Sequence, residues 1–153
     1  MSGKLATLAT LSLVLAACSA KAPSTATAPP SPGYSDASTS ADIHAGLLTP
    51  GSDTLYAAES EPPATPEAWA KVEAGAEQLI EGAALMQTGS RPEGRAEWIR
   101  ISKAVEDAAR RSASAAHAHD ADALAAADGD FTAQCEDCHN AFRDAGGGMM
   151  RKP

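Results

Sequence analysis

Two cysteines and a histidine near the end of the chain, in the run CEDCH at 135–139, have the types and spacing for one specific chemistry. Cys135 and Cys138 are three residues apart, so on a helix both thiols lie on one side. His139 follows directly, and its ring can turn toward the same side. Covalent attachment of haem c needs this set, because two thiols must reach the two vinyl groups of the porphyrin and an imidazole must reach the iron. The motif therefore predicts one covalently attached haem c.

Other chemistries also use paired cysteines. A zinc half-site would need a second pair of ligands, and the three cysteines of the chain leave only Cys18 besides this pair. A dithiol redox motif fits a strand-to-helix junction better than an alanine-rich helix. A chance match is the remaining alternative.

The first residues have the features of an export signal. Lys4 precedes an apolar run from Leu5 to Leu15, which is too short to span a bilayer as a helix. The following Leu15-Ala16-Ala17-Cys18 resembles a lipobox, in which the cysteine becomes the lipidated first residue of the mature protein. We therefore predict a lipoprotein signal peptide at 1–17, lipidation of Cys18 and a periplasmic protein anchored to a bacterial membrane. The alternative is an ordinary signal with a cysteine near its cleavage site.

Composition separates a tether from a folded domain. Residues 18–41 are mostly Ser, Thr, Ala and Pro, so we predict a disordered tether after the lipid anchor. The net charge of −8, with no basic stripe, argues against a nucleic-acid partner. Aromatic residues make up only 4% of the chain, so a bulky apolar cofactor would supply volume that the side chains lack.

The domain at 42–145 is predicted to be all-α, an antiparallel four-helix bundle followed by a flexible tail at 146–153. Three segments, at about 65–89, 93–119 and 120–145, repeat apolar residues at intervals of three and four. Their predicted inward positions are Trp69, Val72, Ala76, Leu79, Ala83 and Met86; Trp98, Ile101, Val105, Ala108, Ser112 and Ala115; and Leu124, Ala127, Phe131, Cys135, Cys138 and Phe142. A weaker first helix at 41–63 must kink or restart at Pro50. Thr65 and Pro66 predict the start of the second helix, and Gly89 its end.

A helical bundle with one CxxCH near its C-terminus resembles the class II cytochromes c, the cytochrome c-prime family. The similarity covers about residues 42–143 and includes Asp42-Ile43, Pro50, the PEAW run ending at Trp69, ALMQTGSR at 84–91, Trp98 and CEDCHNAF at 135–142. Of these, only the last is a strong motif. The resemblance implies a haem between the helices, linked to Cys135 and Cys138, with His139 as the proximal iron ligand. It also implies electron transfer or small-gas binding with no transformed substrate, and it allows a homodimer.

The chain departs from this family at one informative position. Many members read Asp-Ile-Met where this chain reads Asp42-Ile43-His44, and their low-spin relatives use that methionine as the sixth iron ligand. We therefore hypothesise that His44 is the distal iron ligand of a bis-histidine haem. The alternative is a solvated His44 and a five-coordinate iron.

The expected function is one-electron transfer with redox protein partners, so we expect no enzyme and no catalytic residue. A five-coordinate module that binds or senses nitric oxide or carbon monoxide is the first alternative, and a haem-free helical lipoprotein that serves as an interaction module is the second. We expect Met86 to pack in the core, and we expect His117 and His119 to be exposed at the turn between the last two helices.

Overall fold

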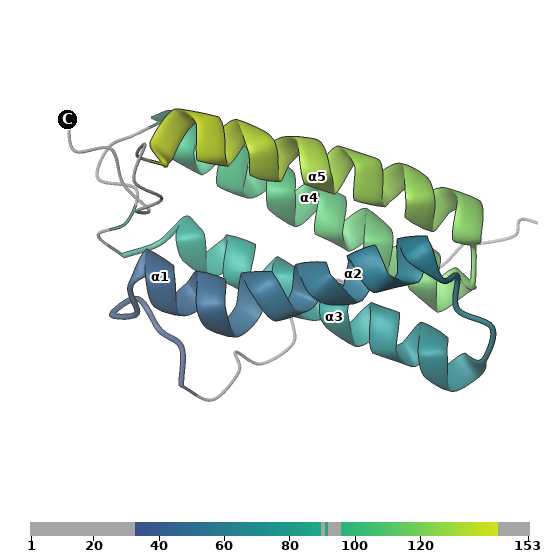
Figure 1. The fold of residues 1–153 in the computed structure, drawn as a ribbon. Coiled ribbons are helices and arrows are strands. Elements are labelled where there is room, and N and C mark those ends of the chain that lie inside the picture. The colour runs from purple at the N-terminus through teal and green to yellow at the C-terminus, as the bar shows by residue number, and fades with distance from the viewer. Residues whose placement is uncertain (1–32, 90, 92–95, 144–153) are drawn as a thin grey trace, which may run out of the picture.

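The computed structural model describes residues 33–89, 91 and 96–143, and within these residues the chain is entirely helical (Figure 1). The first helix comprises α1 (Ser40–Ile43), a π-helical segment η1 (His44–Leu48) and α2 (Thr49–Ser60). It is followed by α3 (Pro66–Met86), α4 (Ala96–Ala118) and α5 (Ala121–Phe142). The first helix, α3, α4 and α5 form an antiparallel four-helix bundle, which confirms the predicted fold class. The predicted signal peptide, Cys18, most of the tether and the tail lie outside the described residues.

Local sequence explains where the helices begin and end. The Thr65 hydroxyl accepts a hydrogen bond from the backbone N–H of Ala68 at 3.2 Å, and Pro66 occupies the first turn of α3. Gly89 follows the end of α3 with φ of +67°, a backbone conformation that glycine adopts without a steric cost. Asp120 caps α5 by accepting from the N–H of Ala123 at 2.9 Å. The stop and start signals predicted at Thr65, Pro66 and Gly89 are therefore confirmed.

The first helix differs from the expectation in its form more than in its start. It begins at Ser40, one residue before the predicted start at 41 and within the predicted tether at 18–41, because Thr39 and Asp42 form a capping box and Ser40 is buried. The chain continues through Pro50 because the helix widens just before it. In η1 the N–H of Thr49 donates to the carbonyl of His44, five residues back, and Pro50 then sits in the first turn of α2, where its missing N–H costs nothing.

The predicted inward positions form the core. All of those assigned to α3 and α4 are buried, as are Leu124, Ala127 and Phe131 of α5. The last third of α5 is only partly buried, and there Cys135, Cys138 and Phe142 pack against the edge of the core. The site motif therefore lies at the edge of the core.

The helices pack unevenly around the bundle. α3 packs closely on α4 and on the first helix, whereas α5 packs mainly on α4 and only lightly on α2. Figure 1 shows α5 lying along α4 on one side and α1 and α2 lying along α3 on the other. The first helix and α5 therefore pack less closely on each other than either does on its other neighbour. Among the described residues, no helix is long and apolar enough to cross a membrane.

Candidate functional site

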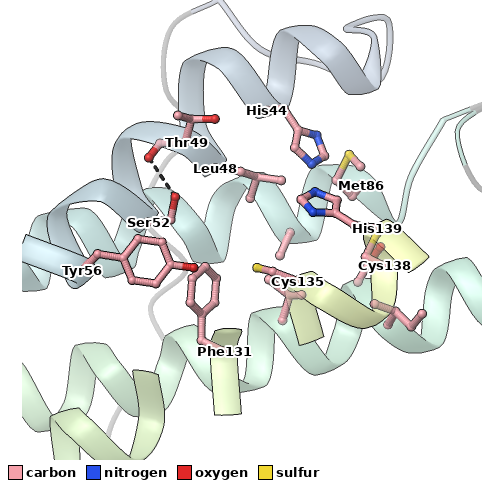
Figure 2. A pocket seen from close by; sticks show the side chains of 14 residues that line it. His44, Leu48, Thr49, Ser52, Tyr56, Met86, Phe131, Cys135, Cys138 and His139 are labelled. Atoms are coloured by element: carbon pink, nitrogen blue, oxygen red, sulfur yellow. Dashed lines mark hydrogen bonds between the residues drawn. The ribbon is translucent and has the colours of Figure 1, made fainter. Parts of the chain in front are cut away.

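A cavity of about 220 Å³ opens between the first helix and α5 (Figure 2). All four helices contribute side chains to it, and it contains the complete predicted set of His44, Cys135, Cys138 and His139. Most of the remaining wall is apolar, including Leu48, Ala83, Met86, Ile101, Val105 and Phe131. An apolar cavity with a few convergent polar groups is typical of a cofactor site.

The two histidines of the cavity come from opposite sides of the bundle and face each other. The ring centroids of His44 and His139 are 6.3 Å apart, and their planes are inclined by 32°. Two imidazoles on opposite faces of one metal ion would have centroids about 6 Å apart, given about 2 Å from metal to nitrogen and about 1 Å from nitrogen to ring centre on each side. The observed separation of the ring centroids therefore matches the spacing expected for two imidazoles that bind one metal ion. The structure brings His44 to the site, as the distal-ligand hypothesis requires.

Backbone geometry orients the ring of His44. Its Nδ1 lies 2.9 Å from the carbonyl oxygen of Ser40, one turn earlier, to which a protonated Nδ1 donates. A histidine that donates through one ring nitrogen presents the lone pair of the other, and such a partner is typical of metal-ligating imidazoles. Burial lowers the pKa of His44, so the ring is neutral near pH 7 and able to act as a ligand.

His139 occupies the last turn of α5 and is partly buried. Burial lowers the pKa of His139, and the positive charge of Arg143 lowers it further. Its imidazole is therefore also neutral near pH 7. Both rings are in the protonation state that iron ligation needs.

The two thiols are free and partly buried. Burial raises the pKa of Cys135 to about 12, with smaller contributions from Cys138 and Glu136, and burial also raises the pKa of Cys138. Since the thiolate is the reactive form, these thiols are poor redox nucleophiles in the folded chain, contrary to what a dithiol motif requires. A thioether sulfur carries no proton, so burial imposes no such penalty on a covalently linked pair.

Met86 lies in the wall of the cavity and packs in the core, as expected. It is 3% exposed and belongs to a cluster with Ile43, Leu47 and Trp98. The indole N–H of Trp98 donates to the backbone carbonyl of Met86 at 2.6 Å, which fixes the end of α3 against the start of α4. The ring of Trp98 in turn meets Phe142 edge to face at 5.0 Å. Of this cluster, Met86 is the residue that lines the cavity.

The other two histidines lie at the turn between α4 and α5, outside the cavity, and are exposed as predicted. Nδ1 of His117 is 3.2 Å from a carboxylate oxygen of Glu73, and the ring of His119 stacks on Trp69 at 5.2 Å. Across the described part of the chain, no three or more His, Cys, Asp or Glu side chains are arranged to hold a metal ion by themselves. An iron held by His44 and His139 would therefore need the porphyrin to supply its other ligands.

Sequence reasoning missed the polar side of the cavity. Thr49, Ser52 and Tyr56 of the first helix line it, and the Ser52 hydroxyl donates to the carbonyl of Thr49 at 2.9 Å (Figure 2). A usable signal was present, because residues 44, 48, 52 and 56 are spaced by four and share one face of a helix. No sequence signal could have indicated that Ser40 orients the ring of His44, since it does so through its backbone carbonyl.

Comparison of the chain with protein-family models, with characterised proteins and with solved structures finds no match. The functional argument therefore depends on the four-helix bundle and on the geometry of the site.

Proposed function

We propose that the chain is a monohaem c-type cytochrome that carries out one-electron transfer, with His139 and His44 as the two axial ligands of the iron. The observation that supports this most directly is the 6.3 Å separation of the two imidazole rings in the cavity that also contains Cys135 and Cys138. Haem c bound there would supply a couple that accepts and releases one electron.

Each residue of the site has a separate task in this proposal. Cys135 and Cys138 would hold the cofactor through thioether bonds, and His139 would bind the iron from the same helix. His44 would bind it from the first helix, held in its tautomer by the carbonyl of Ser40. The apolar wall would limit the access of water to the iron. Two neutral imidazoles favour the ferric state more than an imidazole and a thioether do, so we propose a lower potential than that of a His/Met relative.

No step in this function needs a catalytic acid or base, so we propose an electron carrier and not an enzyme. Its partners would be redox proteins. The lipobox-like sequence at Cys18 supports a location at the periplasmic face of a membrane, to which lipid on that cysteine would anchor it.

The gas-binding alternative requires an open sixth position on the iron. The proximity of His44 to His139 and the neutral state of its ring favour a closed one. In the haem-free alternative the cavity has no cofactor. Absorption spectra distinguish the electron carrier, the gas-binding module and the haem-free module.

The test is to record absorption spectra of the purified protein, made together with a haem-attachment system, in the oxidised and reduced forms with and without carbon monoxide. We expect a red protein with a low-spin ferric spectrum and slow carbon monoxide binding. His44→Ala should become high-spin and bind carbon monoxide readily, whereas the control His117→Ala should match the wild type. A high-spin wild type that is unchanged by His44→Ala would favour the gas-binding module. A colourless protein with two free thiols would contradict haem attachment altogether.

A further inference from the structure

Arg91 is buried at the end of the bundle next to the histidine pair, although arginine is rarely found inside a protein. It is 5% exposed, and backbone carbonyls receive most of its hydrogen bonds. Its Nε and Nη2 donate to the carbonyl of Leu85 at 2.8 and 2.5 Å, and Nη2 also donates to the Thr88 hydroxyl at 3.0 Å. Nη1 donates to the carbonyls of Asp36 and Ser38, the first at 3.1 Å. One guanidinium thus joins the end of α3 to the segment that precedes the first helix.

A short series of contacts leads from this segment to His44. Ser38 is followed by Thr39, whose hydroxyl accepts from the N–H of Asp42 at 3.1 Å and whose N–H donates to the Asp42 carboxylate at 3.0 Å. This capping box fixes the first turn of α1. The backbone carbonyl of Ser40, the residue after Thr39, accepts a hydrogen bond from Nδ1 of His44 at 2.9 Å. The acceptor that orients the ring therefore lies two residues from a carbonyl held by Arg91.

Burial also anchors this turn, at Ser40 and at Ile43. Ile43 is fully buried against the cluster that contains Leu47, Met86 and Trp98, so its side chain also fixes α1. Ile43 fixes the position of the turn, whereas the carbonyls bound by Arg91 fix the path of the chain into it. Loss of Arg91 should therefore loosen the first turn without unfolding the bundle.

We propose that Arg91 is a positioning residue for the distal ligand: it holds the chain before α1 so that the Ser40 carbonyl orients the ring of His44 toward His139. The inference rests on the proposed function, because it assumes that His44 ligates iron. A planar guanidinium is needed because its nitrogens donate at once to the carbonyl of Leu85 at the end of α3 and to carbonyls of the segment before α1. A lysine ammonium is a single compact donor and cannot reach both sets of acceptors. Charge pairing contributes little, since the Asp36 carboxylate is 3.8 Å away and exposed.

The experiment compares Arg91→Ala and Arg91→Lys with the wild type in the covalently loaded protein. Two readouts are used: the ferric spin state with the rate of carbon monoxide binding to the reduced form, and hydrogen exchange at the backbone amides of Ile43 and His44. Loss of one charge-assisted hydrogen bond shifts a two-state population by about tenfold or more. We expect about tenfold faster carbon monoxide binding, a partial high-spin fraction and about tenfold faster exchange in Arg91→Ala, and a smaller change in the same direction in Arg91→Lys. Added guanidinium ion at millimolar concentration should partly restore the low-spin spectrum of Arg91→Ala.

Two matched variants serve as controls. Arg110→Ala removes an arginine that pairs with Glu106 on the surface of α4, and Asp36→Asn removes the distant carboxylate but keeps the carbonyl. Both should match the wild type in all readouts. If Arg91→Ala does not fold, Thr39→Val, which removes only the capping hydroxyl, should give the same changes at smaller size.

The outcomes separate this inference from the proposed function. A low-spin wild type whose Arg91 variants keep the spin state, carbon monoxide rate and exchange of Arg110→Ala would overturn the positioning role alone. A high-spin wild type that His44→Ala leaves unchanged would overturn the ligand assignment, and the positioning role with it.

Discussion

Asp128 is a buried carboxyl group without a complete set of partners, and replacing it with asparagine should stabilise the protein at neutral pH. The side chain is 2% exposed, its Oδ1 accepts from the Ser112 hydroxyl at 2.9 Å, and its Oδ2 has no partner. Burial raises the pKa of Asp128 above its ordinary value of 3.8, the bond from Ser112 opposes this rise, and the negative charge of Glu59 adds to it. The folded state therefore favours the protonated form.

The raised pKa of Asp128 determines how the free energy of unfolding changes with pH. Below the pKa of about 3.8 that Asp128 has in the unfolded chain, both states are protonated and the carboxyl costs little. As pH rises toward the higher folded pKa, the unfolded chain releases its proton first, so the free energy of unfolding falls by up to about 1.4 kcal/mol per pH unit. Above the folded pKa the loss is complete and constant. Asparagine has no such titration, and its amide still accepts from Ser112.

At pH 7 the gain for Asp128→Asn should be on the order of 1 kcal/mol, because the substitution removes a buried negative charge but places an amide NH2 where the unpartnered Oδ2 was. A gain of 1 kcal/mol corresponds to a rise in Tm of about 4 °C or more for a domain of this size. Urea denaturation of both proteins from about pH 3 to pH 8 measures the difference as a function of pH. Asp130→Asn, on the exposed side of the same helix, is the control and should change stability by less than about 0.5 kcal/mol. A difference independent of pH, or a less stable Asp128→Asn at pH 7, would refute this reasoning.

Three further substitutions test the packing of the bundle and the identity of the iron ligand. Gly51→Ala should destabilise the bundle by about 1 to 3 kcal/mol, because a Cβ there would lie 2.7 Å from the carbonyl oxygen of Gly75 on α3. Gly129→Ala, which meets nothing within 4 Å, should be neutral or stabilising by up to about 1 kcal/mol in the same thermal denaturation assay. Met86→Leu keeps the volume of a buried side chain but removes its sulfur, so the absorption spectrum should stay low-spin; a change to high-spin would make Met86 an iron ligand in place of His44.

The sequence was sufficient to predict the helices and their buried faces because both depend on local spacing. On α3 and α4 every apolar residue at the predicted positions is buried, since an interval of three or four keeps side chains on one face. The site motif was found for the same reason, as Cys135, Cys138 and His139 are neighbours in the chain. The approach of His44 was expected only from its place in a family pattern, and local spacing alone would not have indicated it.

The parts that could not be predicted depend on backbone groups and on contacts between distant segments. The carbonyl of Ser40 can orient a histidine only because Thr39 and Asp42 begin the helix there, and Arg91 reaches Ser38 across more than fifty positions of sequence. Every residue has a backbone carbonyl, so composition and periodicity do not reveal which carbonyls accept a hydrogen bond from a side chain.

The π-helical segment shows how a local irregularity can serve the site. Pro50 removes a backbone donor that an uninterrupted α-helix would use, and the wider turn over His44–Leu48 lets the chain pass it without a break. The turn keeps Ile43 and Leu47 in the core while Leu48, next to them in sequence, lines the cavity together with His44. Because the wide turn contains one extra residue, a regular helix through 40–60 would rotate the residues before Pro50 by about 100° in total relative to those after it. In such a helix Leu47 could not lie in the core while His44 and Leu48 line the cavity, so the positions of Pro50 and His44 depend on the same turn.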